Sequence, residues 1–292
     1  MEITYYPGCT LKANARNFED SALCALRQLD VEVKELSRWN CCGTVFSLSA
    51  DDLIHHMAPI RNLIRVKESN SDKVMTLCAM CYNTLKRANE RVKADPESLE
   101  KINKVMYKEE IDYEGDVKIF HLLELIRDEI KFENLTSRVV KPLKDLKVAC
   151  YYGCMLVRPR EIGIDDVENP TVIENLITAL GGDPVDFPYK TECCGAYQTV
   201  DKPNIIAERT NQIISSAKNR GAEVIVVSCP LCAFNLDHRQ KQTGQLFMDF
   251  IGLPILYFTQ LLAIALNCPK DTLKFDLHYF DPKPLLKEKG LI

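Results

Sequence analysis

The spacing of the cysteines constrains this 292-residue chain more than any other feature. Each half carries a single cysteine, then an adjacent cysteine pair after 31 or 38 intervening residues, and then a Cys-x-x-Cys after a further 35 or 34 intervening residues. Ten of the 13 cysteines belong to these two groups. The N-terminal set is Cys9, Cys41, Cys42, Cys78 and Cys81, and the C-terminal set is Cys154, Cys193, Cys194, Cys229 and Cys232.

The residues around the cysteines repeat as well. YYPGC at 5–9 matches YYGC at 151–154, NCCG at 40–43 matches ECCG at 192–195, and MTLCAMCYNTL at 75–85 matches VVSCPLCAFNL at 226–236. The period is far longer than that of a solenoid repeat, so it indicates two related globular halves. We expect one domain at 1–140 and a second at 141–292, which includes the C-terminal tail.

Strand and helix patterns alternate in both halves. Apolar strands are predicted at 3–6 and 148–152, each ending beside the first cysteine of its set, and buried strands at 74–77 and 224–228 lead into the Cys-x-x-Cys motifs. Helices are predicted between them, which is typical of α/β halves with parallel-sheet cores. We therefore expect two pseudo-symmetric domains whose cysteines lie at the C-terminal ends of the strands, where ligands bind in such sheets.

Three cysteines lie outside the repeat, and the tail has a different composition. Cys24, Cys150 and Cys268 fall in apolar segments, so we expect them to pack in the core. The tail at 269–292 is polar and contains several prolines, and we expect it to lie over the surface.

Composition excludes several classes of protein. Hydrophobic residues make up 46% and charged residues 27%, as in soluble globular proteins, and the net charge of −4 offers no basic field for nucleic acid or an anionic membrane. The longest apolar stretch, 246–266, is interrupted by Asp249, Gly252 and Pro254, so no transmembrane segment is predicted. No secretory signal is recognisable, so a cytoplasmic location is expected. Since the cytosol keeps thiols reduced, the cysteines indicate metal binding rather than disulfides.

The number and spacing of the thiols favour iron–sulfur chemistry. A structural zinc site takes four ligands, commonly from two Cys-x-x-Cys pairs, whereas each half offers five thiols in another pattern. Gly43 and Gly195 after the cysteine pairs allow a positive φ or a close backbone approach to inorganic sulfur. Zinc in one or both sites, and redox disulfides without a metal, remain alternatives.

The double motif resembles the cysteine-rich CCG domain family, and within it the B subunits of the soluble heterodisulfide reductases of methanogenic archaea. The likeness covers nearly everything from Cys9 to Cys232. It implies one noncubane [4Fe-4S] cluster per half, held by the ten repeated cysteines. It also implies a role in methanogenesis as the catalytic subunit that reduces the mixed disulfide of coenzyme M and coenzyme B to two thiols.

The same resemblance implies a set of partners. They are a hydrogenase or formate dehydrogenase module, a flavin-containing electron-bifurcating subunit and a ferredoxin-like iron–sulfur subunit. The chain lacks the C-x2-C-x2-C-x3-C run of a bacterial ferredoxin, so we expect its electrons to come from a separate subunit.

Disulfide reduction needs two electrons, and two clusters related by a duplication can supply one each. The clusters are then the catalysts, and we assign no catalytic side chain; none of the five histidines falls in a repeated pattern. The anionic groups of the two coenzymes need cationic partners. The candidates near the first cysteine of each set are Lys12, Arg16, Arg158 and Arg160.

An alternative function leaves the chain without a substrate of its own. Members of the family also serve as iron–sulfur subunits in glycolate or lactate oxidation and in succinate dehydrogenase or fumarate reductase-type complexes. In that case the chain is an electron-relay or assembly subunit, and its clusters only transfer electrons between other proteins.

Overall fold

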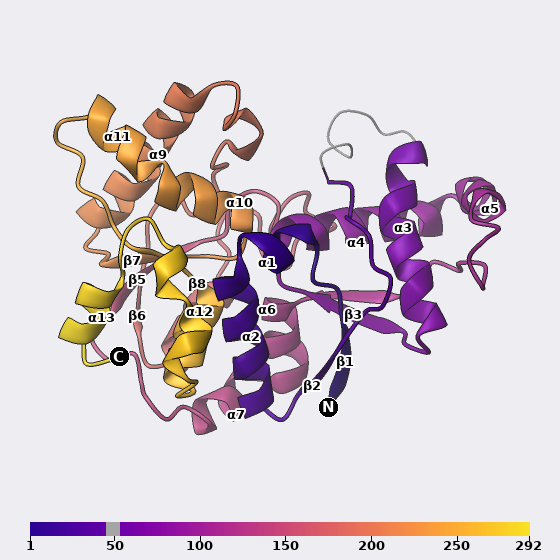
Figure 1. Cartoon of the computed structure of the whole chain (residues 1–292), viewed down its shortest axis with the longest axis horizontal. Coiled ribbons are helices and arrows are strands. Elements are labelled where there is room, and N and C mark those ends of the chain that lie inside the picture. The colour runs from indigo at the N-terminus through magenta and orange to yellow at the C-terminus, as the bar shows by residue number, and fades with distance from the viewer. Residues whose placement is uncertain (45–52) are drawn as a thin grey trace.

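The computed structural model describes residues 1–44 and 53–292 and contains two four-stranded sheets, each parallel throughout. The N-terminal sheet has the order β2-β1-β3-β4, and the C-terminal sheet has the equivalent order β6-β5-β7-β8. The strands are β1 (Glu2–Tyr5), β2 (Glu32–Glu35), β3 (Lys73–Thr76), β4 (Lys118–His121), β5 (Lys147–Tyr151), β6 (Asp183–Val185), β7 (Val224–Val227) and β8 (Ile255–Tyr257). The predicted α/β class with two pseudo-symmetric halves is confirmed (Figure 1).

Helices connect the parallel strands. In the N-terminal half they are α1 (Cys9–Ala13), α2 (Arg16–Gln28), α3 (Leu53–Glu68), α4 (Ala79–Ala94), α5 (Pro96–Val105), α6 (Leu122–Leu125), the π-helix η1 (Ile126–Ile130) and α7 (Phe132–Ser137). In the C-terminal half they are α8 (Val172–Ala179), η2 (Ala196–Gln198), α9 (Pro203–Asn219), α10 (Pro230–Ala233), the π-helix η3 (Phe234–His238), α11 (Gln240–Leu246) and α12 (Phe258–Ala265). Every residue of β7 is buried, as expected of a parallel strand covered on both faces.

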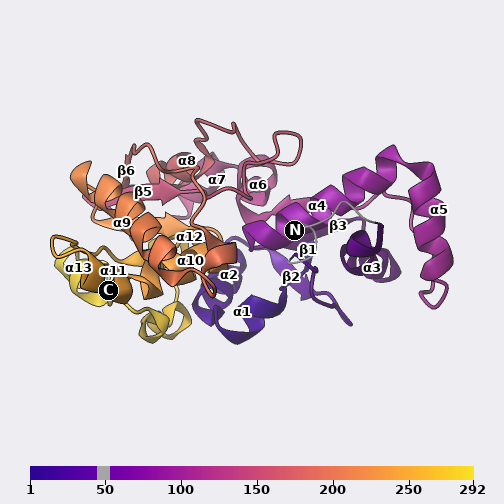
Figure 2. The ribbon, with the colours of Figure 1, turned by 90° about the horizontal axis from the view of Figure 1, so that it is seen from above.

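The two halves pack against each other through α2 and α12, which lie side by side in both views (Figures 1 and 2). The ring of Phe18 stacks on Tyr257 with centroids 4.2 Å apart and meets Phe258 edge to face at 5.7 Å. The hydroxyls of Ser21 and Thr259 lie 2.7 Å apart in the same contact. This apolar contact brings the two sheets into one molecule.

The tail differs from the expectation that it lies over the surface. It forms η4 (Lys270–Leu273), η5 (Phe275–Leu277) and α13 (Lys283–Glu288), and buries Leu273, Leu286 and Leu291. Its apolar residues are few but regularly placed, so they anchor the polar segments between them.

The remaining expectations for the core are confirmed. Cys24, Cys150 and Cys268 are buried, and the thiols of Cys24 and Cys268 are hydrogen bonded across the two halves. Of the helices in the described part of the chain, none is both long enough and apolar enough to cross a membrane.

Candidate metal centres

The cysteines of each set gather at the carboxyl edge of one sheet. The single cysteine follows β1 or β5, the cysteine pair follows β2 or β6, and the Cys-x-x-Cys follows β3 or β7. Since neighbouring parallel strands end at the same edge, three loops distant in sequence meet there. The strands therefore place the cysteines at the carboxyl edge of each sheet, as the sequence predicted.

In the N-terminal set the thiols meet in pairs. Cys9 Sγ lies 3.9 Å from Cys41 Sγ, and Cys42 Sγ lies 3.6 Å from Cys81 Sγ. The thiols of Cys78 and Cys81 are also hydrogen bonded. Cys9 and Cys41 are exposed, whereas the other three are buried.

The C-terminal set repeats these pairs position by position. The thiol of Cys154 is hydrogen bonded to that of Cys193, and Cys232 contacts both Cys194 and Cys229. Cys193 is the exposed member. The duplicated sequence therefore encodes the same arrangement of thiols twice.

Hydrogen bonds between neighbouring thiols divide them into proton donors and acceptors. The bond from Cys154 lowers the pKa of Cys193 to about 6, and the bond from Cys41 lowers the pKa of Cys42. The pKa of Cys154 is raised in turn by its bond to Cys193. Since metals bind the thiolate form, the thiols whose pKa is lowered are the ones most readily available as ligands.

The backbone leaves room beside the sulfur atoms. Gly8 and Gly153 have φ values of 73° and 65°, and a Cβ there would lie 2.9 Å from Cys81 Sγ and 3.1 Å from Cys232 Sγ. Gly43 and Gly195 also have positive φ, 76° and 78°, as the sequence predicted. Any side chain at Gly8 or Gly153 would therefore press on a thiol.

The donor set fits a cluster of several irons. Among residues 1–44 and 53–292, no three His, Cys, Asp or Glu side chains lie close enough together to bind one metal ion. A four-iron cluster distributes its ligands over several irons, and thiolates are its usual ligands. Five thiols in pairs around one sheet edge, with glycines beside them, suit such a group.

Two tyrosines that the sequence analysis left unassigned hold the cysteine pairs in place. Tyr6 Oη donates to Asn40 O at 2.8 Å, and Tyr151 Oη donates to Glu192 O at 2.6 Å. Each acceptor directly precedes a cysteine pair, and each tyrosine lies three residues before the first cysteine of its set. The repeated YY motif was the signal that could have identified them.

The two sets meet at the contact between the halves. The thiols of Cys78 and Cys229 are hydrogen bonded, and Ala79 N donates to Ser228 O at 3.2 Å. The two Cys-x-x-Cys loops therefore lie back to back. The exposed cysteines of the two sets are Cys9, Cys41 and Cys193.

Comparison with known proteins identifies the family. Residues 3–86 and 148–237 match the family described as "Cysteine-rich domain", CCG, which together is more than half of the chain. The chain belongs to the cysteine-rich CCG domain family. Its CCG membership and its ten paired cysteines indicate iron–sulfur clusters.

Relatives of this chain are named for different functions. The chain is 30% identical over 285 residues, 97% of its length and 99% of the relative's, to the 8-methylmenaquinol:fumarate reductase membrane anchor subunit of Wolinella succinogenes. It is 29% identical over 275 residues to the B subunit of the ferredoxin/F(420)H(2)-dependent CoB-CoM heterodisulfide reductase of Methanosarcina acetivorans, covering 93% of this chain and 91% of that one.

A solved structure shares the CCG fold. The crystal structure of a hypothetical protein from Helicobacter pylori aligns with a TM-score of 0.77 at 14% identity, over 95% of this chain. The chain spans 51% of that protein's length, and the likeness concerns the fold alone.

The C-terminal set of cysteines surrounds a small cavity of about 20 Å³. Tyr197 and Met80 line it together with the cysteines, and Tyr197 Oη lies 3.9 Å from Met80 Sδ. Burial raises the pKa of Tyr197 to about 12, so its hydroxyl stays protonated. Met80 belongs to the N-terminal Cys-x-x-Cys, so both CCG halves contribute to this wall.

The four predicted cationic residues lie in unlike surroundings. Lys12 Nζ is paired with Glu19 Oε1 at 2.8 Å and with Glu35 Oε2 at 2.6 Å, and Arg16 is exposed on α2. Arg158 and Arg160 line one open cavity of about 510 Å³.

Arg87 and Met155 also line that cavity, so it carries three guanidinium groups, of which the sequence analysis missed one. Arg87 comes from α4 of the other half, and only the packing of the halves brings it beside Arg158. The structure thus brings two of the four candidates together and leaves Lys12 and Arg16 apart from them.

Proposed function

We propose that this chain is the disulfide-reducing subunit of a heterodisulfide reductase-type complex, with one noncubane [4Fe-4S] cluster held by each cysteine set. The observation that carries the proposal is the contact between Cys78 and Cys229, which puts two one-electron centres back to back. When bound, the clusters supply single electrons at close range. A disulfide that receives one electron from each cluster, together with two protons, gives two thiols. No further electron carrier is then needed.

The chain's own residues bind and orient the substrate. The cavity with Arg87, Arg158 and Arg160 can hold an anionic group such as a sulfonate, phosphate or carboxylate, because guanidinium groups bind such anions in bidentate fashion. The mixed disulfide of coenzyme M and coenzyme B has groups of this kind. Arg158 is itself held by Thr191 O at 2.6 Å and Glu168 Oε1 at 3.1 Å, which fixes its direction.

Electrons come from partner proteins in this proposal. The exposed Cys9 and Cys41 leave the outer side of the N-terminal set open to a docked protein. A ferredoxin-like iron–sulfur subunit, which receives its electrons from a flavin-containing one, would reach the cluster from there. The relatives' names support a place in an oxidoreductase complex.

The test combines cofactor content with single-cluster variants. Protein purified without oxygen should contain about eight irons and matching acid-labile sulfide if each set holds four irons. Cys41→Ser and Cys193→Ser should each lose one cluster and nearly all reduction of the coenzyme M–coenzyme B disulfide, while circular dichroism shows that the fold persists. Multi-turnover reduction with one cluster present, or stoichiometric zinc without iron, would contradict the proposal.

A second function is favoured by the relative from Wolinella succinogenes, which aligns from end to end at 30% identity. The chain would then be a relay that passes electrons to or from a fumarate reductase-type partner. Wild-type protein that exchanges electrons with such a partner at catalytic rates, yet reduces no disulfide, would support the relay instead.

A further inference from the structure

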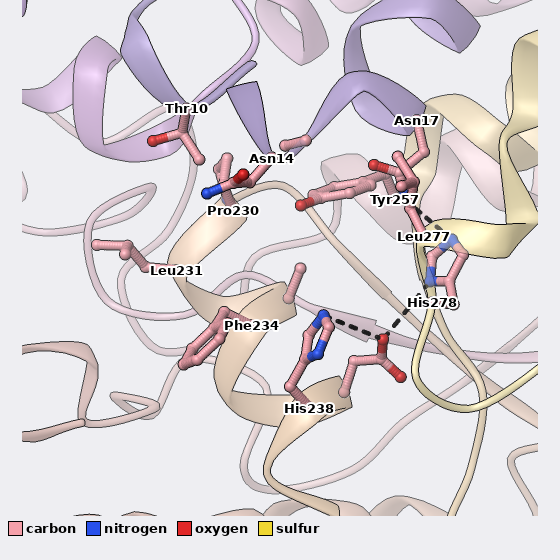
Figure 3. Close-up of a pocket in the computed structure, with 13 residues that line it drawn as sticks. Thr10, Asn14, Asn17, Pro230, Leu231, Phe234, His238, Tyr257, Leu277 and His278 are labelled. Carbon is pink, nitrogen blue, oxygen red and sulfur yellow. Dashed lines mark hydrogen bonds and ion pairs between the residues drawn. The ribbon is translucent and has the colours of Figure 1, made fainter. Parts of the chain in front are cut away.

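A cavity of about 270 Å³ lies between the halves, beside the C-terminal Cys-x-x-Cys loop and the segment that follows Cys9 (Figure 3). Thr10 and Asn14 on the α1 side form one wall, and Leu231, Phe234 and His238 on α10 and η3 form the other. Thr10 follows a cysteine of the N-terminal set, and Leu231 lies between two cysteines of the C-terminal set. The cavity is therefore lined by sequence neighbours of cysteines from both sets, and Thr10 Oγ1 lies 3.8 Å from Cys9 Sγ.

Its counterpart in the other contact between the halves is the cavity with Arg87, Arg158 and Arg160, where hydrogen bonds join α4 to the loop after Cys154. The repeat aligns Tyr82 and Asn83 with Ala233 and Phe234. Tyr82 Oη donates to Ile162 O at 3.0 Å, and Asn83 Nδ2 donates to Met155 O at 2.8 Å and to Arg158 O at 2.7 Å.

Alanine and phenylalanine have no groups that could make such bonds. The contact between α10 and the α1 loop therefore lacks the hydrogen bonds that join α4 to the loop after Cys154. Two substitutions between the repeats create this asymmetry.

Three ionisable side chains converge on the inner end of the cavity (Figure 3). Asp237 Oδ2 lies 3.8 Å from His278 Nδ1 and 4.0 Å from His238 Nε2. The Asp237 carboxylate accepts the backbone N–H groups of Tyr279 at 2.7 Å and Phe280 at 3.0 Å, which fix its position.

The two histidines differ in what they can do. His278 Nε2 lies 3.0 Å from Asn17 Nδ2 and 2.9 Å from Gln260 Nε2, so it accepts from these amides and carries its hydrogen on Nδ1. Burial lowers the pKa of His278 to about 4, so it stays neutral. His238 stacks on Phe234 with centroids 5.3 Å apart, and its side chain is 48% exposed.

We propose that this inter-half cavity binds one arm of a small-molecule disulfide and that His238, oriented by Asp237, protonates the thiolate formed on that arm. The proposal rests on the proposed function and adds the proton donor. The S–S bond breaks as two electrons arrive from the reduced clusters. One product sulfur takes its proton from the His238 imidazolium, which solvent restores, and the other takes its proton from water.

The asymmetry of the two sides fits a disulfide with unlike arms. One side presents the guanidinium groups of Arg87, Arg158 and Arg160, whereas the inter-half cavity presents amides, an aromatic ring and histidine. An acidic arm suits the first side, and an arm with amide or apolar groups suits the second. His238 and Arg87 occupy equivalent positions of the repeat, so one substitution separates the proton donor from the anion site.

The proton-transfer test uses His238→Ala. We expect kcat for the coenzyme M–coenzyme B disulfide to fall about 100-fold with little change in KM, the size typical of a lost general acid. Added imidazole should restore part of the rate, and the alkaline limb of the pH profile, where a general acid loses its proton, should change. Asp237, His278, Tyr279 and Arg239 are the other titratable or charged groups around His238, and all stay in place.

The cavity is tested by Ala233→Tyr combined with Phe234→Asn, which installs the two residues that hydrogen bond α4 to the other half. Calorimetry with the same disulfide, without reductant, should show at least tenfold weaker binding than wild type. Iron content and the cluster absorbance should be unchanged in all variants. Lys241→Ala, at an exposed position of the next helix, is the matched control and should bind and turn over like wild type.

The outcomes separate this inference from the proposed function. Wild type that binds the disulfide in the cavity but never reduces it would overturn the function and leave the site standing. Full turnover without imidazole rescue in His238→Ala would refute the proton donor. Unchanged binding in the double variant would refute the cavity as the site.

Discussion

Tyr6 and Tyr151 show how a single hydroxyl can position a metal-binding loop. Both are buried and both donate to the carbonyl before a cysteine pair. Their surroundings differ in one respect, because Asn40 O also accepts from Asn62 Nδ2 at 3.0 Å. The Glu192 carbonyl has only the tyrosine among the hydrogen bonds seen in residues 1–44 and 53–292.

Replacing these tyrosines by phenylalanine should therefore have unequal effects. Tyr151→Phe leaves the Glu192 carbonyl without its donor and should lower the free energy of unfolding by about 0.5–1.5 kcal/mol, with partial loss of the C-terminal cluster. Tyr6→Phe should lower the free energy of unfolding by less, because Asn62 Nδ2 still donates to Asn40 O. Denaturant unfolding and iron content measure both, and Tyr107→Phe on the surface is the control. Equal losses in both variants would contradict this account.

His121 illustrates a buried imidazole that must stay neutral. Its Nε2 lies 2.7 Å from Leu77 O and its Nδ1 accepts from Leu123 N, so the hydrogen is on Nε2. Burial lowers its pKa from 6.5 to about 4. The folded state thus binds this proton less readily than the unfolded state does.

Acid should therefore destabilise the fold through His121. The contribution of neutral His121 to the free energy of unfolding is complete above pH 6.5 and is lost as the pH falls toward 4. The expected loss between pH 7 and pH 5 is about 2 kcal/mol. His121→Asn keeps a good N-cap for α6 and should be less sensitive to acid over this range. Denaturant titrations at pH 7, 6 and 5 compare the two proteins, which share the same cysteines. Parallel pH curves would show that His121 does not contribute.

At the scale of elements, α4 and α10–η3 follow the same motif but make different contacts. Asn83 ties α4 to the loop after Cys154 through two hydrogen bonds, whereas Phe234 at the equivalent position lines the inter-half cavity. The apolar pattern did not predict either of these helices, which begin within the Cys-x-x-Cys motifs. The pattern did not predict α5, although Asp95 accepts from Ser98 N at 3.1 Å as an N-cap and Pro96 follows it.

The two equivalent positions should respond differently to leucine. Asn83→Leu leaves two carbonyls without a donor and should cost about 1–3 kcal/mol of unfolding free energy. Phe234→Leu borders open space and should cost less than about 1 kcal/mol. Thermal and denaturant unfolding of both variants, with iron content as a check on cluster loading, decide the point. A larger loss in Phe234→Leu would contradict the difference in packing.

At the scale of the whole molecule, the contact between α2 and α12 decides how close the two cysteine sets lie. Phe18 is fully buried there and touches both Tyr257 and Phe258. The Cys-x-x-Cys loops meet only because this contact orients the halves. Stability and the proposed chemistry therefore depend on the same interface.

Phe18→Ala should weaken that interface. Removing a buried phenylalanine typically costs about 3–5 kcal/mol, part of it from the cavity left behind. We expect lower stability and weaker magnetic coupling between the two clusters, measured by denaturation and electron paramagnetic resonance. Leu23→Ala, at a partly buried position of the same helix, is a milder control. Unchanged coupling at reduced stability would show that Phe18 does not set the distance between the sets.

The sequence by itself determined the class of fold and predicted the candidate ligands. Cysteine spacing is a local property repeated twice, and strand and helix periods follow from which side chains face the core, so both can be identified from the order of residues. The carboxyl-edge position of the cysteines then follows from parallel topology. These predictions needed no information on how the halves pack.

Only the tertiary structure decided the contact of Cys78 with Cys229, the grouping of Arg87 with Arg158, and the entry of His278 from the tail beside Asp237. Each joins residues far apart in the chain. Such contacts depend on the relative orientation of two sheets, which the packing of Phe18 and its neighbours sets. No short-range pattern records that orientation, and for this reason the histidines could not be assigned from their positions in the sequence.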